Sequence, residues 1–247
     1  MKSKSIQLIL FISIFTLSCN HHEKEVKQKK TASIHSSNSL FIGNSYTYRN
    51  GGIDYHLSQI IKADSTGFNC YITRAAKGKY HLYSHWEDQT TLTIFKQKKW
   101  DNVLLQEYSS GPIRDSLEFF KNGKLWAEKI KKANPQTQIY LFATWGYKGT
   151  KTMVDSLNMQ YQKLAKMIGA KTVPVGLLWK SLKDKINLYD KDGAHPNRMG
   201  TFLNACLFYE YMYNKDITKT AYFDNLIDRE IQLQLKKWAH DFHLKQG

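Results

Sequence analysis

Two short segments, far apart in the chain, carry residue types that together could perform nucleophilic catalysis. The first, residues 39–52 (S-L-F-I-G-N-S-Y-T-Y-R-N-G-G), presents Ser45 directly after a short apolar run. The second, residues 190–198 (D-K-D-G-A-H-P-N-R), places Asp192 three residues before His195 in a glycine-containing loop. A carboxylate at that spacing can accept the Nδ1–H of the imidazole, which leaves Nε2 free to take a proton from a serine hydroxyl. The sequence therefore predicts that Ser45, His195 and Asp192 act as nucleophile, base and orienting acid.

Each segment alone also has an ordinary structural explanation. A Gly-Asn-Ser after a strand is usually a turn, and Asp-x-x-His before a helix commonly caps that helix. The catalytic interpretation rests on the combination, because the two segments lie at opposite ends of a run of alternating strands and helices.

The elements that must position these residues are read from hydrophobic patterning. Apolar runs predict strands at about 39–43, 67–74, 102–106, 139–144 and 171–175. Amphipathic segments predict helices at about 53–63, 89–98, 116–133, 151–168, 177–185, 199–213 and 224–243, whereas 75–87 is expected to be irregular. Strands that alternate with helices indicate an α/β domain with a five-stranded parallel sheet, covered on both faces. Ligands bind such sheets at the carboxyl ends of the strands, and Ser45 lies just beyond the first strand.

With these elements in place, the chain resembles the SGNH hydrolases, also called the GDSL esterase/lipase superfamily, over roughly residues 38–213. The segment G-N-S at 43–45 is similar to the first motif of that family, with Asn in place of the commoner Asp. The segment D-G-A-H at 192–195 is similar to its last motif. The resemblance implies a flavodoxin-like three-layer sandwich, ester hydrolysis through a Ser-His-Asp triad, and no metal or organic cofactor.

The same resemblance implies the donors that would stabilise a developing oxyanion. The family uses the backbone N–H of the serine, here Ser45, and a glycine amide after the second strand, a place that Gly78 occupies. Its third donor is an Asn in Gly-x-Asn-Asp, whereas this chain has L-Q-E-Y at 105–108. Gln106 could deliver an equivalent amide, or it could simply be the polar residue that ends a strand.

Other side chains are expected near the same edge of the sheet. Tyr46 and Arg49 follow the serine and are predicted to contact substrate at the rim of the cleft. Trp145, just after the fourth strand, could stack on a sugar ring or pack inside the protein. His81 and His85 either contact the substrate or pack a long loop.

The N-terminus is predicted to lie outside the fold. Residues 1–18 have a basic start and an apolar run that is too short to span a membrane, which is typical of a secretory signal. Cys19, which follows a small residue, resembles the lipidated cysteine of bacterial lipoproteins; the alternative is a plain signal peptide with a chance cysteine. Residues 19–37 are polar and indicate a flexible tether, so the folded domain is predicted at 38–247. We expect an exported protein that is lipid-anchored to a bacterial cell-envelope membrane.

The net charge of the chain indicates which classes of binding partner to expect. The formal net charge is +15, which fits an anionic polymer or membrane surface, or a lysine-rich surface without a specific partner. Nucleic acid is not expected, because no nucleic-acid-binding motif accompanies the charge and export would separate the protein from that partner.

The remaining cysteines leave two alternatives open. Export would permit a disulfide between Cys70 and Cys206, whereas their apolar surroundings fit two buried free thiols equally well. No zinc-binding spacing is present, so no metal is predicted.

Together these features predict an exported, lipid-anchored serine esterase. The family and the location favour removal of O-acetyl groups from a carbohydrate, including an acylated and anionic polysaccharide. Two alternatives stay open: hydrolysis of longer acyl chains or thioesters, and a non-catalytic glycan-binding lipoprotein of the same fold.

Overall fold

The computed structural model describes residues 36–246. The predicted signal peptide at 1–18, the lipidation site Cys19 and the tether up to residue 35 lie outside the described residues. The first strand already begins at Ser36, so the folded domain starts slightly earlier than predicted. No helix in the described part has both the length and the apolar character that a membrane crossing requires.

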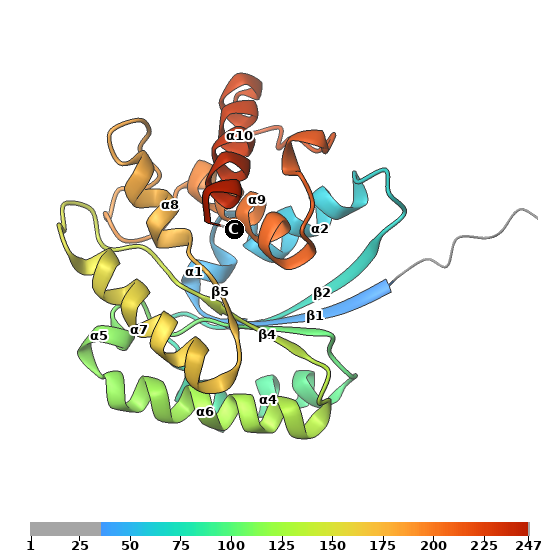
Figure 1. Cartoon of the computed structure of the whole chain (residues 1–247), viewed down its shortest axis with the longest axis vertical. Coiled ribbons are helices and arrows are strands. Elements are labelled where there is room, and N and C mark those ends of the chain that lie inside the picture. Colours follow the sequence, from blue (N-terminus) through green and yellow to red (C-terminus); the bar gives the residue numbers. More distant parts are fainter. Residues whose placement is uncertain (1–35, 247) are drawn as a thin grey trace, which may run out of the picture. The chain divides into compact units, whose positions relative to one another are not determined.

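Five parallel strands form the central sheet, in the order β2-β1-β3-β4-β5 (Figure 1). They are β1 (Ser36–Gly43), β2 (Asn69–Ala76), β3 (Asn102–Leu105), β4 (Gln138–Phe142) and β5 (Lys171–Val173). This arrangement confirms the predicted α/β fold with a five-stranded parallel sheet. The chain winds outward in both directions from β1, and the carboxyl end of such a central strand is where doubly wound sheets bind ligands.

Helices cover both faces of the sheet (Figure 1). One face packs against α2 (Ile53–Lys62), α8 (Val175–Leu182), α9 (Arg198–Tyr213) and α10 (Arg229–Gln246). The other packs against α3 (Leu82–Glu87), α4 (Gln89–Lys96), α6 (Ser116–Ala133) and α7 (Met153–Ile168). Short elements complete the described chain: α1 (Ser45–Tyr48), η1 (Arg49–Gly51), α5 (Gly111–Arg114) and η2 (Ile217–Lys219).

The strands are apolar on both sides because each face has its own core. Leu104 of β3 belongs to the core beneath α2 and α9, whereas its neighbour Leu105 belongs to the core beneath α4 and α6. Successive side chains of a strand point to opposite faces, so a stretch of strand that is covered on both faces is mostly apolar, as in residues 40–42 of β1 and 103–105 of β3.

Two expectations about the helices are wrong for identifiable reasons. A helix, α3, forms inside the segment expected to be irregular, because Leu82 is buried and its carbonyl accepts the Trp126 indole N–H at 3.0 Å. The last helix begins at Arg229 instead of 224. The Asp224 carboxylate is held by Arg198, with Nε and Nη2 at 2.8 and 3.0 Å, and this ion pair fixes the preceding segment outside the helix.

The structure decides between the two alternatives for the cysteines. Cys70 and Cys206 are both free thiols. Cys206 is fully buried in α9, and burial raises the pKa of its thiol. Cys70 Sγ instead lies 3.1 Å from the Tyr213 hydroxyl.

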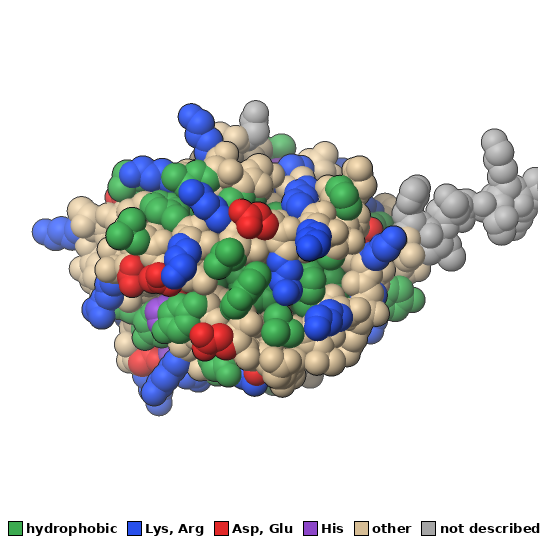
Figure 2. Space-filling model, turned by 90° about the horizontal axis from the view of Figure 1, so that it is seen from below, with side chains coloured by type: hydrophobic (Ala, Val, Ile, Leu, Met, Phe, Trp, Pro, Cys, Tyr) green, Lys and Arg blue, Asp and Glu red, His purple; other side chains and the backbone are tan. Residues whose placement is uncertain are grey.

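Positive charge is widely distributed over one face of the domain (Figure 2). Figure 2 shows the face on the side of α4 and α6, where Lys and Arg side chains are spread among apolar side chains and a few acidic ones. On this face the basic side chains form no single continuous patch (Figure 2).

Candidate active site

Ser45 is the first residue of α1 and lies at the carboxyl end of β1. Asn44 caps this short helix, and its side-chain oxygen accepts the backbone N–H two residues later at 3.2 Å. Gly43 is required by packing, because a Cβ at this position would clash with Thr47 Oγ1 and with Gln106 Oε1. The apolar strand therefore ends in a tight turn that leaves the serine half-buried.

The structure brings together the three residues that the sequence predicted as a triad. His195 Nε2 lies 2.9 Å from Ser45 Oγ, and His195 Nδ1 lies 2.5 Å from Asp192 Oδ2. Asp192 Oδ1 also accepts the backbone N–H groups of Ala194 and His195, each at 2.9 Å. The hydrogen bond from His195 is the main cause that holds the pKa of Asp192 well below its usual range. With Nδ1–H donating to the carboxylate, Nε2 is the atom that can take the serine proton.

The loop at 189–196 is fixed from several sides. The Asp190 N–H donates to the His195 carbonyl at 2.9 Å. Gly193 has a φ of 68°, in the left-handed region that favours glycine, and its carbonyl accepts the Lys148 N–H at 2.8 Å. The His195 imidazole is therefore presented by a constrained loop.

Asn50 joins the segment that carries Ser45 (residues 44–52, the nucleophile segment) to the loop at 189–196 (the histidine loop). Local sequence patterns did not predict this role. Asn50 Nδ2 donates to the Pro196 carbonyl at 2.8 Å and to Thr201 Oγ1 at 3.0 Å. Its φ of 54° is left-handed, a conformation that Asn adopts more readily than most residues. The buried His56 donates its Nε2–H to the Asn50 carbonyl at 3.0 Å. The Asn-Gly-Gly at 50–52 signals a turn, but nothing in it shows what the side chain reaches.

Two backbone amides are available beside the nucleophile. Gly78 lies in the turn after β2, where a Cβ would lie 3.0 Å from Tyr48 Oη of the nucleophile segment. The preceding residue, Lys77, donates its N–H to the Gly43 carbonyl at 3.3 Å. Within residues 36–246, neither the Ser45 N–H nor the Gly78 N–H donates a hydrogen bond to another residue. Both amides thus remain candidates for oxyanion donors.

Gln106, the candidate for a third donor, bonds the backbone beside Ser45. Its side chain is fully buried, and Oε1 accepts the Asn44 N–H at 2.8 Å and the Thr47 hydroxyl at 3.0 Å. Its Nε2 donates to the Glu107 carbonyl at 2.5 Å. These bonds turn the amide toward the loop that carries the serine and away from solvent. Gln106 therefore supports the backbone that precedes Ser45, which fits the alternative in which it is the polar residue that ends a strand.

The two histidines after the second strand pack the loop. His81 Nδ1 lies 2.7 Å from Glu107 Oε1, and its ring stacks on that of Tyr108 with centroids 4.8 Å apart. His85 is fully buried and donates its Nε2–H to the Gly43 carbonyl at 2.7 Å. His85 thus holds the end of β1 from the opposite side of the sheet to α1.

Two of the three predicted substrate contacts are buried instead. Trp145 is 1% exposed and lies between two other rings, with centroids 4.5 Å from Tyr46 and 4.0 Å from Trp179. Its indole N–H donates to the Ala194 carbonyl at 2.9 Å. Tyr46 is 2% exposed and its ring meets His195 edge-on. Neither ring has a free face for a sugar, so both form the floor under the histidine loop.

Other polar residues lie around the histidine loop and the segments that follow β3 and β4. Arg49 is exposed, as predicted for the rim, and its guanidinium lies 4.0 Å from the Asp190 carboxylate. Ser109 Oγ lies 2.9 Å from Tyr147 Oη, which links the segment after β3 to the segment after β4. This hydroxyl pair could not be predicted from local sequence patterns, because its two residues are 38 positions apart.

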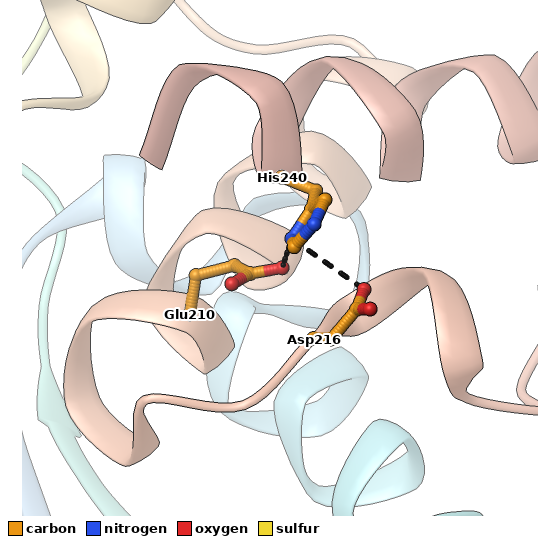
Figure 3. A group of neighbouring side chains, drawn as sticks. All are labelled: Glu210, Asp216 and His240. Atoms are coloured by element: carbon orange, nitrogen blue, oxygen red, sulfur yellow. Dashed lines mark hydrogen bonds and ion pairs between the residues drawn. The ribbon is translucent and has the colours of Figure 1, made fainter. Parts of the chain in front are cut away.

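One group of possible metal ligands lies away from the triad: Glu210, Asp216 and His240 (Figure 3). His240 Nδ1 lies 3.0 Å from Glu210 Oε1 and 3.4 Å from Asp216 Oδ1. Glu210 Oε1 also accepts the Ile217 N–H at 2.8 Å, and Asp216 Oδ1 accepts the N–H and hydroxyl of Thr218. These bonds fasten α10 to α9 and η2, which explains the cluster as a docking contact without an ion.

Solved structures with the same fold were found, although the sequence matches no protein-family model and no curated protein. A protein from Slackia heliotrinireducens, provisionally described as an SGNH hydrolase, superposes with a TM-score of 0.62 at 23% identity, over 72% of this chain and all of the other. A DUF4886 family protein from Bacteroides uniformis has a TM-score of 0.69 at 18% identity, over 86% of this chain and 96% of the other.

An enzyme of stated activity is among the similar structures. A variant of an acetyl xylan esterase from Geobacillus stearothermophilus has a TM-score of 0.55 at 15% identity, over 72% of this chain and 95% of the other. At these identities the likeness shows the fold, and it confirms the predicted resemblance to the SGNH hydrolases at that level.

Proposed function

We propose that this chain, which has the SGNH hydrolase fold, is a serine ester hydrolase with Ser45 as its nucleophile. The observation that carries the proposal is the 2.9 Å approach of His195 Nε2 to Ser45 Oγ, with Asp192 on the other ring nitrogen. Such a chain of acceptor, imidazole and hydroxyl activates a serine that is otherwise a weak nucleophile. The similarity in fold to SGNH hydrolases and to an acetyl xylan esterase supports the same reaction class.

The geometry fits a two-step mechanism. His195 takes the proton of Ser45 Oγ as that oxygen attacks the carbonyl carbon of the ester, and the carbonyl oxygen becomes negative. The N–H groups of Ser45 and Gly78 stabilise this oxygen. The intermediate collapses to an acyl-serine, and His195 gives its proton to the departing alcohol. Water, deprotonated by His195, then attacks the acyl-serine, releases the acid and restores the serine.

The preferred substrate is an O-acetylated carbohydrate. This choice is supported by the fold shared with an acetyl xylan esterase and by the expected export of the chain. Longer acyl esters and thioesters are the competing substrates, because the same triad would cleave them. We further propose that the enzyme is attached to a bacterial cell-envelope membrane through a lipid on Cys19.

The test is hydrolysis of p-nitrophenyl acetate and p-nitrophenyl butyrate by the purified full chain. Ser45→Ala and His195→Ala proteins should each lose at least about a thousandfold in kcat, since both groups act in the same steps. Ser65→Ala is the matched control, because Ser65 is exposed and remote from the triad. Activity that survives Ser45→Ala would refute the nucleophile, and the acetate-to-butyrate ratio decides between short and longer acyl groups.

A further inference from the structure

A cavity of about 840 Å³ opens beside the loop at 189–196, which carries His195. It lies between residues 145–151, which follow β4, and residues 179–189, which include the end of α8 and the segment after it. Its charged lining is almost entirely basic and comprises Lys148, Lys151, Lys180, Lys183 and Lys185, with Asp184 as the single acidic residue.

Much of this positive charge is not neutralised by the protein. Within residues 36–246, Lys148, Lys151 and Lys185 form no ion pair with a carboxylate, and all three are exposed. Lys180 and Lys183 are different, because the Lys180 ammonium lies 2.7 Å from Asp155 and the Lys183 ammonium lies 4.0 Å from Asp184. The Lys185 ammonium lies 6.0 Å from the centroid of the Trp238 ring. Exposed lysines along the lining of one cavity create a local positive potential that attracts anions.

The cavity and the catalytic loop share a wall. The Lys148 N–H donates to the Gly193 carbonyl at 2.8 Å, and the Tyr189 hydroxyl donates to the Gly146 carbonyl at 2.8 Å. Gly193 lies two residues before His195. A molecule seated in the cavity therefore contacts segments that are bonded directly to the loop that carries the histidine.

Aromatic rings accompany the lysines. Tyr147 and Tyr189 both line the cavity, and both residues are half-buried. The Tyr147 hydroxyl also lies 2.9 Å from Oγ of the buried Ser109. Rings beside hydrogen-bonding groups suit the flat apolar faces and hydroxyl edges of sugars.

We propose that this basic cavity is a subsite for negatively charged sugar units that neighbour the acylated sugar. The enzyme would thus act on an acylated anionic oligosaccharide or polysaccharide, with the ester at Ser45 and flanking acidic groups among Lys148, Lys151 and Lys185. This inference rests on the proposed ester hydrolysis for its catalytic consequence, whereas binding of the anionic sugar can be tested without it.

The first experiment measures binding by calorimetry, without any ester. Three oligosaccharides of equal length serve as probes: oligogalacturonate, which carries carboxylates, a sulfated cello-oligosaccharide, and the neutral cello-oligosaccharide. We expect the full chain to bind an anionic probe at least about tenfold more tightly than the neutral one, and the difference should shrink as salt screens the charges. The two anionic probes show whether carboxylate or sulfate is preferred.

The variant is the combination Lys148→Gln, Lys151→Gln and Lys185→Gln. It should weaken binding of the preferred anionic probe by about tenfold, because three exposed ion pairs each contribute modestly. The control combination, Lys124→Gln, Lys132→Gln and Lys163→Gln, removes equal charge from exposed positions of α6 and α7 and should leave binding within twofold. Equal losses in the two variants, or equal binding of neutral and anionic probes, would overturn the subsite.

A second experiment connects the subsite to catalysis. Chemically acetylated oligogalacturonate and acetylated cello-oligosaccharide are compared as substrates, and the cavity variant should lose about tenfold in kcat/KM selectively for the anionic one. Anionic binding without any ester hydrolysis would refute the proposed function but not the subsite. Hydrolysis of both substrates without preference for the anionic one would refute the subsite but not the proposed function.

Discussion

Single residues at the site divide into those that would act on the ester and those that hold them. Ser45 and His195 present reactive atoms 2.9 Å apart. Gln106 and His85 instead turn inward and bond the backbone around Gly43 and Asn44. A serine that must be placed within a few tenths of an ångström needs such inward-facing support, because small displacements of reacting groups cost large factors in rate.

The support given by Gln106 predicts a measurable loss of stability. Gln106→Ala would leave the buried Asn44 N–H and the Thr47 hydroxyl without their acceptor, and each unsatisfied buried group costs about 1–3 kcal/mol. We expect the free energy of unfolding in urea to fall by about 2 kcal/mol or more. We also expect kcat for ester hydrolysis to fall, because the backbone beside Ser45 loses its support. Gln136→Ala, at an exposed position, is the control. A variant with unchanged stability and lower kcat would instead restore Gln106 as a direct oxyanion donor.

At the scale of elements, the site depends on joining two ends of the fold. The start of α1 carries the proposed nucleophile, and the loop at 189–196, just before α9, carries the proposed base. Asn50 bridges them through its bonds to Pro196 and Thr201. The distance from the serine to the histidine is therefore set by a contact between elements and not by either segment alone.

Asn50→Gly isolates this bridge, because glycine accepts the left-handed backbone but removes both side-chain hydrogen bonds. We expect kcat for p-nitrophenyl acetate to fall about tenfold or more while KM changes by less than about threefold, since reactive groups are displaced and not lost. Asn214→Gly is a matched control, because Asn214 is also left-handed, with a φ of 51°, and ends α9 away from the triad. An equal fall in kcat for both variants would contradict the bridging role.

The packing of α2 against α9 predicts a pH-dependent contribution to stability. Asp64, just after α2, accepts hydrogen bonds from Tyr209 at 2.8 Å and from Lys215 at 2.5 Å. Burial alone would raise the pKa of Asp64, but these bonds and those from Thr66 lower it to about 2. Because the folded pKa lies below the unfolded value, the stabilisation is complete above about pH 4 and is lost as the pH falls toward 2.

Asp64→Asn should therefore lower the free energy of unfolding by about 1–2 kcal/mol at pH 7 and by much less near pH 2. Urea unfolding at several pH values measures this difference. Glu128→Gln, on the exposed side of α6, should show little effect at either pH. A loss at pH 7 that persists undiminished to pH 2 would show that the carboxylate charge is not its cause.

At the scale of the whole molecule, the proposed lipid on Cys19 predicts that the enzyme is attached to a membrane. If Cys19 is lipidated, the full chain expressed in a bacterium should partition into the detergent phase of Triton X-114, and Cys19→Ser should remain aqueous or unprocessed. The lipid supplies most of the membrane affinity in this account. A wild-type chain that stays in the aqueous phase would contradict the anchor and favour a plain signal peptide.

The order of the elements was predictable from the sequence because it depends on local periodicity. The five strands and most helices appear where apolar runs and amphipathic segments indicate them, and Gly169 ends α7 in a left-handed conformation as such a glycine should. The pairing of Ser45 with the loop that carries Asp192 and His195 was also predictable. Residue type, spacing and position in a parallel sheet all indicate the same triad.

Burial of the aromatic residues could not be predicted in this way. Trp145 follows a strand at the catalytic edge, and only the packing of Tyr46 and Trp179 on its two faces removes it from the cleft. The inward turn of Gln106 and the reach of Asn50 depend likewise on partners that are distant in sequence. Contacts of this kind are set by tertiary packing, which local patterns do not encode.

The central claim is that Ser45 is an activated nucleophile, and covalent labelling tests it most directly. The full chain would be treated with a fluorophosphonate, and the modified peptide would be identified by mass spectrometry. The triad geometry predicts one adduct on Ser45, abolished by Ser45→Ala and strongly slowed by His195→Ala. An adduct on another serine, or labelling of Ser45 at the same rate without His195, would contradict it.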